Sequence, residues 1–284
     1  MKTVPATPAG PIDDVRRADA RARSALAAVV VRSAQLWRSI ADSSAPVPGL
    51  AWTAGQTAAH VVADMGEYTE VLTRHVNGET AELNIPDGSP ARARNSANDR
   101  HLVDVPERDM RRLADLLEAA AAKYLAAASA IDTSERVALL TADGLVLEPA
   151  VMTCLLLGEQ LVHGLDIARA AHRPWNIERD DALLAIPAAL SLVPKYLRPR
   201  TTNASFEFRL RGAPRYRVAI GDGTGVVTVA GKKADCVITA DPVTFLLLGL
   251  NRVPQLPQLL RGKLRAGGRK PWLAAKFGTL LESP

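Results

Sequence analysis

The chain has 284 residues, enough for two ordinary domains, and 48% of them are hydrophobic while only 4% are aromatic. The net charge of +5 is uneven, because residues 201–284 carry 13 Lys and Arg against 5 Asp and Glu. This basic end lacks interleaved aromatic residues and any nucleic-acid-binding motif, so we expect no nucleic-acid partner. A solvated face, or the rim of a pocket for an acidic ligand, explains the charge better.

Targeting and redox features point to the cytoplasm. The sequence opens with no apolar segment behind a basic end, and the longest apolar candidate, residues 182–193, is shorter than the roughly 20 residues that span a bilayer. Cys154 and Cys236 stand far apart in apolar surroundings, which favours buried thiols over a disulfide framework. We therefore expect a cytoplasmic protein with no membrane span.

Helical periodicity dominates the first two thirds of the chain. It predicts four main helices, over about residues 13–45, 53–76, 106–131 and 149–171. Residues 77–99, between the second and third helices, are rich in helix breakers and predict an extended loop, and residues 141–149 predict a short hairpin or turn. Four helices with short or medium connections favour an antiparallel bundle, and such bundles build metal sites from facing helices.

The last third changes character. After a further predicted helix over residues 178–196 and a linker, RPRTTNA, the apolar period becomes two from residue 204. This period predicts half-buried antiparallel strands, over residues 205–211, 215–220, 226–230 and 236–239, and two helices, over 241–250 and 270–282. The predicted fold class is therefore α followed by α+β, with a helical bundle over residues 1–200 and a small antiparallel-sheet domain over residues 201–284.

The fourth predicted helix is apolar nearly all the way round, except for one polar stripe. At about 100° per residue, Glu159, His163 and Asp166 fall within about 60° of one another. Burying ionisable groups costs several kcal/mol unless each finds a partner. A bound cation is one candidate partner.

His60, on the second predicted helix, is the candidate third ligand, because its face also carries Asp64 and Glu67. Two imidazoles and one carboxylate hold a divalent cation and leave positions open, as in catalytic zinc sites. In the alternative interpretation, His60 is a core histidine satisfied by one hydrogen bond. Glutamate and histidine four residues apart also occur on exposed helices that bind nothing.

The remaining polar groups near this cluster have weaker assignments. Asp166, about one turn beyond His163, is expected to orient a ligand or to cap a neighbouring backbone group. The other histidines lie near helix ends or at the edge of the predicted loop, where solvated histidines are expected; these are His75, His101 and His172.

Three stretches, WTAGQTAAH, NSANDR and GEQLVHGLDIARA, resemble the DinB-like bundle of the mycothiol-dependent maleylpyruvate isomerase family. Residues 204–281 resemble the sterol-carrier-protein-like domain that is often fused to this bundle. The resemblance covers nearly the whole chain. It implies that zinc or a similar divalent cation is bound by His60, Glu159 and His163. It also implies a low-molecular-weight thiol, mycothiol in actinobacteria, as cosubstrate.

The resemblance implies an enzyme, an isomerase or S-transferase, in which zinc activates the thiol for attack on an electrophilic substrate. It does not select the substrate. Basic residues of the predicted strands are candidates to hold an anionic substrate, although arginines that alternate along a strand more often face water; they are Arg209, Arg211 and Arg215. Two alternatives remain: a non-catalytic lipid or small-ligand carrier that uses the C-terminal domain, and a regulatory protein with a relic metal site.

Overall fold

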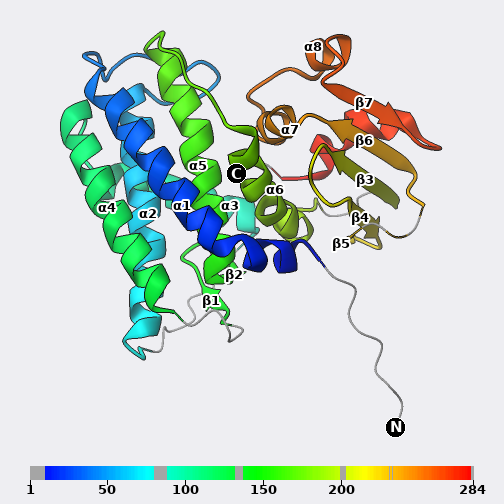
Figure 1. The fold of residues 1–284 in the computed structure, drawn as a ribbon, viewed down its shortest axis with the longest axis horizontal. Helices are drawn as coiled ribbons and strands as arrows, with labels where there is room; N and C mark the ends of the chain where they lie inside the picture. Colours follow the sequence, from blue (N-terminus) through cyan, green and yellow to red (C-terminus); the bar gives the residue numbers. More distant parts are fainter. Residues whose placement is uncertain are drawn as a thin grey trace. The chain divides into compact units, whose positions relative to one another are not determined.

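The computed structural model describes residues 10–79, 88–131, 137–198, 203–229, 231 and 233–282. They form two compact units (Figure 1). One unit spans Ala18–Ala185, and the other joins Met1–Arg17 to Ile186–Ser283. This division differs from the boundary expected at residue 200, because the first turns of the first helix and the later part of α6 (Arg179–Leu192) group with the C-terminal residues.

The first unit is a helical bundle, as the sequence predicts. Its main helices are α1 (Pro11–Arg38), α2 (Ala54–Val76), α4 (Met110–Ala130) and α5 (Pro149–Ala170). The central helix is α2, which packs against α3 (Pro90–Asp104), α4 and α5. A two-stranded antiparallel hairpin, β1 (Leu139–Leu140) and β2 (Val146–Leu147), precedes α5 at the position predicted for a hairpin.

Start signals in the sequence fix where α2 and α4 begin. The Thr53 side chain accepts a hydrogen bond from the Gln56 backbone N–H, and the Gln56 side chain accepts one from Thr53 N–H, so the two residues form a capping box. Asp109 caps α4 by accepting from two backbone N–H groups, which starts the helix at Met110 rather than near residue 106. These caps fix the first residue of each helix, and the apolar side chains along it decide which face is buried.

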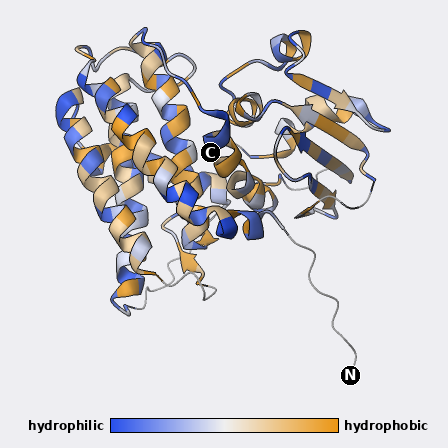
Figure 2. Cartoon of the chain, viewed as in Figure 1, coloured by the Kyte–Doolittle hydropathy of each residue, from blue (hydrophilic) through white to orange (hydrophobic). Residues whose placement is uncertain are grey.

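The most deeply buried helix is α5. Among the helices within the described ranges, it alone is long and apolar enough to cross a membrane by length and composition, and 83% of its most apolar stretch is buried inside the protein. It is mostly orange and tan in Figure 2, whereas α1 mixes blue and orange along its length. We interpret α5 as the core helix of the bundle, since a core helix also meets the length and composition test.

The expectation of an extended loop over residues 77–99 is wrong from residue 90 onward. Ser89 caps α3 and Pro90 occupies its first turn, a combination that favours a helix start. Much of the rest of α3 is polar and lacks an apolar stripe, so that periodicity does not reveal it. Its stability comes from packing of its buried side chains, which are Ala91, Ala93, Arg94, Ala97 and His101. Residues 80–87 of the predicted loop lie outside the described residues.

The second unit contains a five-stranded sheet with the order β5-β4-β3-β6-β7. The strands are β3 (Ala204–Leu210), β4 (Tyr216–Gly221), β5 (Thr224–Val229), β6 (Cys236–Ala240) and β7 (Leu264–Gly267). The pairing of β3 with β6 is parallel and the other pairings are antiparallel, which corrects the expectation of a purely antiparallel sheet. The connection between β3 and β6 passes through the β4–β5 hairpin, so β6 returns alongside β3 in the same direction.

Three details of this unit differ from the sequence-based prediction. The central strand β3 is buried on both faces along most of its length rather than half-buried, since Ser205 and Glu207 on its polar side are buried like Phe206 and Phe208. Strand β7 was not predicted, because its only inward apolar side chain is Leu264 among basic residues. After the predicted α7 (Pro242–Gly249) and a short α8 (Gln255–Leu260), the expected final helix is replaced by 3-10 turns over Pro271–Lys276 and Gly278–Leu280.

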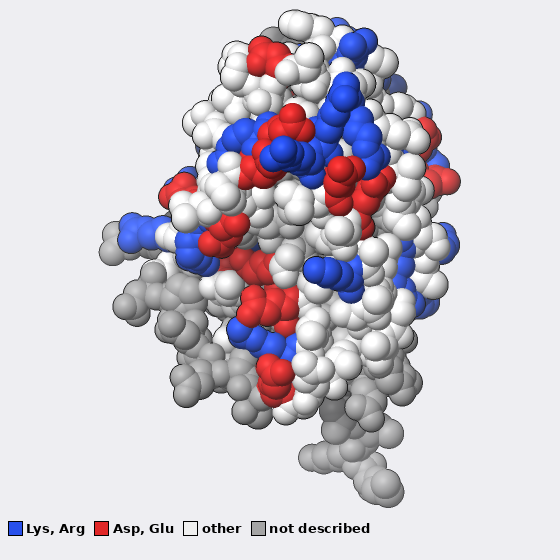
Figure 3. Space-filling model, turned by 90° about the vertical axis from the view of Figure 1, so that its left-hand side faces the viewer, with Lys and Arg blue, Asp and Glu red and all other residues white. Residues whose placement is uncertain are grey.

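Acidic and basic side chains are interspersed on the face of the bundle in Figure 3. One group of them joins two helices, because Arg38 of α1 forms ion pairs with Asp115 and Glu118 of α4, both at 2.6 Å. Such exposed pairs contribute little to stability, because water and salt screen both charges. The bundle therefore depends mainly on its interior.

We predict that Gly164→Ala destabilises the protein, whereas Gly158→Ala on the same helix does not. A Cβ at Gly164 would lie 2.5 Å from Cε2 of Trp175 and closer still to Cζ2, while the nearest atom to a Cβ at Gly158 is the Ala185 Cβ at 3.6 Å. Overpacking at Gly164 should lower the free energy of unfolding by about 1–3 kcal/mol. Gly158→Ala should be neutral or raise it by up to about 1 kcal/mol. Urea unfolding measures both, and equal values for the two variants would contradict this packing.

Candidate metal centre

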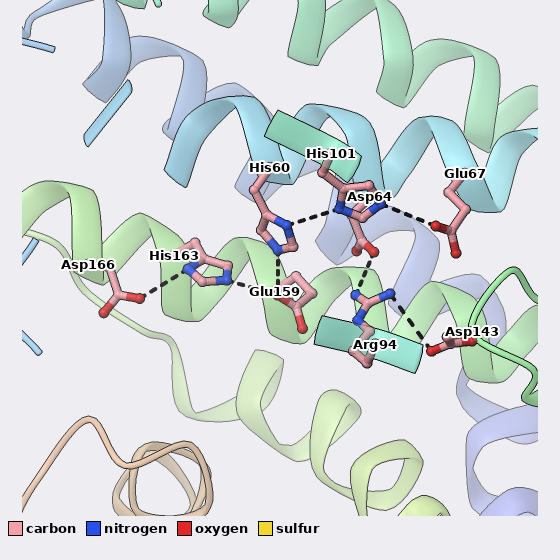
Figure 4. Close-up of polar contacts among 9 residues, drawn as sticks. All are labelled: His60, Asp64, Glu67, Arg94, His101, Asp143, Glu159, His163 and Asp166. Carbon is pink, nitrogen blue, oxygen red and sulfur yellow. Dashed lines mark hydrogen bonds and ion pairs between the residues drawn. The ribbon is translucent and has the colours of Figure 1, made fainter. Parts of the chain in front are cut away.

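Three side chains from two helices converge in the bundle (Figure 4). His60 comes from α2, Glu159 and His163 come from α5, and one candidate ligand atom of each lies within 4.8 Å of the other two. Glu159 Oε2 lies 3.0 Å from His163 Nε2 and 3.8 Å from His60 Nε2. Both imidazoles are buried, but the Glu159 side chain keeps 30% of its surface accessible. The cluster is therefore enclosed on the histidine side and reachable beside Glu159.

The local sequence explains how these groups meet. The capping box at Thr53 starts α2 at Ala54, so that His60 falls in its second turn, and His60 lies on the buried face of the helix. The Trp52 ring, just before the cap, packs against the His60 ring with centroids 4.9 Å apart. On α5, Glu159 and His163 are four residues apart, a spacing that brings two side chains together on one helix face.

Each imidazole has a second partner on its far nitrogen. His163 Nδ1 lies 3.0 Å from Asp166 Oδ2, and Asp166 is fully buried. His60 Nδ1 lies 3.0 Å from Nδ1 of His101, whose Nε2 in turn lies 3.2 Å from Glu67 Oε2. The Nε2 atoms of His60 and His163 are thus both directed toward Glu159.

The expectation that His101 is a solvated histidine is wrong. It belongs to α3 and is 3% exposed. The sequence contains a signal for this, because Arg94, Ala97 and His101 recur at the three- and four-residue spacing of one helix face, and all three are buried. The prediction of a loop over residues 77–99 meant that this spacing was not recognised as helical. His75 and His172 are exposed, as expected.

A buried ion-pair network lies beside the cluster and was not predicted. Arg94 Nη2 donates to Asp64 Oδ1 at 2.6 Å, and Arg94 Nη1 lies 4.0 Å from Asp143 Oδ2, in the turn of the hairpin. All three side chains are buried. The guanidinium offsets the charge of the two carboxylates and links α3 to α2 and to the hairpin. It therefore contributes to the docking of α3.

The charges of the cluster follow from burial and from these contacts. Burial lowers the pKa of His60 to about 4. Burial also acts to lower the pKa of His163, but hydrogen bonds with Asp166 and Glu159 outweigh it and raise that pKa to about 9. Burial acts to raise the pKa of Glu159, but contacts with His163 and His60 outweigh it and hold that pKa well below its usual value. At neutral pH the cluster is a carboxylate between a neutral and a charged imidazole.

The donor set fits a divalent cation of the zinc type. Two imidazole nitrogens and one carboxylate oxygen are zinc ligands that leave a coordination position open. Histidines that bind metal usually hold a carboxylate or other acceptor on their second nitrogen, as His163 does with Asp166. That these residues hold a metal remains a prediction.

The remaining predicted or reactive groups are three arginines of the second unit and the two cysteines. Arg209, 44% exposed, donates to Glu207 at 2.6 Å, Arg215 lies 4.0 Å from the same carboxylate, and Arg211 is exposed; all of them belong to the second unit. Their role as substrate ligands remains a prediction. Both cysteines are free and buried, and burial raises the pKa of Cys154 to about 12, so this thiol is a poor nucleophile.

A helical bundle with an internal His-Glu-His cluster is typical of metal-binding proteins. Comparison of this chain with known protein families and solved structures identifies the kind of bundle. Residues 38–168 match the family model described as the Mycothiol maleylpyruvate isomerase N-terminal domain. These residues include the whole cluster, and the match assigns this part of the chain to that domain family.

Solved structures extend the likeness beyond the bundle. A crystal structure of the mycothiol-dependent maleylpyruvate isomerase is 13% identical and has a TM-score of 0.56, over 88% of this chain and 92% of that chain. A histidine-to-alanine mutant of that enzyme, at 12% identity, has a TM-score of 0.58 with the same coverage. At this identity the likeness concerns the fold, in which an α bundle precedes an α+β part. A comparison with curated proteins finds none that matches in sequence.

We predict that metal binding to this cluster tightens as pH rises through the neutral range. In the metal-free protein His163 is protonated below about pH 9, so coordination through Nε2 must release that proton, whereas His60, with a pKa of about 4, is already neutral. The apparent Kd for zinc should fall about tenfold per unit between pH 6 and pH 8. Chelator competition at several pH values measures it, and a pH-independent Kd would contradict the assigned charges.

Proposed function

We propose that this protein is a metal-dependent enzyme that uses a low-molecular-weight thiol, mycothiol, as cosubstrate, and that it catalyses an isomerisation or an S-transfer in the cytoplasm. The observation that carries the proposal is the convergence of His60, Glu159 and His163 within a domain of the mycothiol maleylpyruvate isomerase family. The substrate is a small electrophile. Its identity depends on residues that have no recognisable motif in the sequence.

The three side chains would hold zinc or a similar divalent ion, which when bound supplies a Lewis acid that lowers the pKa of a thiol. Asp166 accepts a hydrogen bond from Nδ1–H of His163 and so fixes the direction of its Nε2. Burial of both imidazoles excludes water from the inner side of the cluster. The accessible side of Glu159 is the side from which a thiol and a substrate can approach.

The chain's own thiols do not compete for this role. Burial raises the pKa of Cys154 and of Cys236, so both remain protonated near neutral pH. A nucleophilic sulfur must then come from an added thiol. The high pKa of both cysteines therefore favours a thiol cosubstrate over a protein cysteine.

We predict that thiol binding and metal binding occur at the same place. Cobalt(II)-substituted protein should develop a sulfur-to-cobalt charge-transfer band on addition of mycothiol, and turnover of electrophilic substrates should require the same thiol. His163→Ala should abolish both the cobalt spectrum and the band, because it removes one of three ligands. His75→Ala, which alters an exposed histidine on the same helix as His60, is the matched control and should preserve both.

Two results would decide against the enzyme. One is a cobalt spectrum that no thiol perturbs, together with thiol-independent behaviour toward electrophiles. The other is binding of fatty acyl or sterol ligands to the metal-free protein, lost on substitution in the second unit only. Together they would favour a lipid or small-ligand carrier that uses the C-terminal domain.

A further inference from the structure

His101 is not one of the three candidate metal ligands, but it contacts the second ring nitrogen of one of them, His60. Its Nδ1 lies 3.0 Å from Nδ1 of His60, and its Nε2 lies 3.2 Å from Oε2 of Glu67. His60 and Glu67 belong to α2, and His101 belongs to α3. Their side chains are 3%, 14% and 4% exposed, respectively, so Glu67 is the most exposed of the three. Figure 4 shows them as a row that leads away from Glu159.

Hydrogen-bonding rules restrict how protons are distributed along this row. A neutral imidazole has one N–H and one bare nitrogen, so that a contact between two Nδ1 atoms needs one donor and one acceptor. The carboxylate of Glu67 accepts only, and therefore calls for an N–H on Nε2 of His101. A neutral His101 then has a bare Nδ1, which must accept a hydrogen bond from Nδ1–H of His60.

The consequence falls on the far side of His60. With its proton on Nδ1, the ring has a bare Nε2, and this is the atom directed toward Glu159 and the candidate metal position. The distance of 3.8 Å between Nε2 and Glu159 Oε2 is too long for a hydrogen bond, which agrees with two acceptors facing each other across a cation position.

We propose that His101 is a positioning residue for the metal centre: through its contact with Glu67 it selects the tautomer of His60 that offers Nε2 to the metal. The inference rests on the metal site of the proposed function, but it concerns residues to which no role has been assigned. It also explains an asymmetry, because His163 has a carboxylate directly on Nδ1 whereas His60 reaches one only through a second imidazole.

The carboxylate of Glu67 depends on this contact. Its other oxygen, Oε1, is buried and accepts no hydrogen bond from any described residue. Arg94, about two turns before His101 on the same face of α3, holds that helix against α2 through Asp64. Although α3 supplies no candidate metal ligand, its contacts with α2 therefore affect the position of His60.

The row does not provide a proton path to the metal position. Once Nε2 of His60 binds an ion, it has no free lone pair with which to take a proton from a metal-bound group. His101 therefore acts on the orientation and protonation site of His60.

Nitrogen-15 NMR of the histidine rings tests the proposal without any turnover. In the metal-free wild-type protein at neutral pH, His60 should carry its proton on Nδ1 and His101 on Nε2. In His101→Leu, His60 should shift toward the Nε2-protonated form, and the Kd for zinc should rise about 10–100-fold. His101→Gln should restore most of the affinity, because the amide offers one acceptor and one donor. His172→Leu, at an exposed histidine, is the control and should change neither quantity.

If His101→Leu does not fold, as circular dichroism would reveal, Glu67→Leu tests the same row from its more exposed end and should weaken zinc binding in the same direction. A wild-type His60 protonated on Nε2, or unchanged tautomer and affinity in both leucine variants, would overturn the proposal. If wild-type protein binds no zinc, the proposed function fails, while the ring spectra still decide whether His101 sets the tautomer of His60.

Discussion

The structure of the first unit depends on the burial of ionisable groups along one helix. In α5, Glu159, His163 and Asp166 stand among apolar side chains, and 83% of the helix's most apolar stretch is buried. Leaving such groups unpaired would cost several kcal/mol, a large part of the stability of an ordinary domain. Each of them instead meets a partner of complementary charge or hydrogen-bonding capacity. A divalent cation held by His60, Glu159 and His163 would give these groups a further partner.

This constraint extends to the neighbouring helices. Because His60 faces the stripe from α2, its second nitrogen needs a partner as well, and α3 supplies it through His101. The same helix places Arg94 between Asp64 and Asp143, so that α3 is held by polar contacts rather than by an apolar stripe. The cluster, its outer contacts and the docking of α3 therefore form one connected network, in which the loss of one member leaves another buried and unpaired.

Much of this arrangement is predictable from residues alone. Strong helical periodicity and the start signal at Thr53 locate the main helices, and the spacing of Glu159 and His163 on an apolar helix indicates a cluster that His60 completes. The helix α3 escapes such reasoning, because tertiary contacts rather than periodicity stabilise it. His101 and Arg94 are missed for the same reason.

The sheet shows the corresponding limit for strands. Alternation correctly indicates that β4 and β6 are half-buried. It does not reveal that β3 lies between them, or that its polar residues Ser205 and Glu207 are buried as well. Strand β7 owes its existence to pairing with β6, a contact far apart in sequence. Burial and pairing that depend on distant segments are invisible to a local pattern.

The central claim is that the polar stripe of α5 and His60 form a metal site, and metal analysis of protein purified without a histidine tag tests it most directly. The account predicts about one zinc or similar divalent ion per chain, and none in a variant that lacks both His60 and His163. Full occupancy in that double variant, or a wild-type protein that neither contains nor takes up a divalent ion, would contradict it.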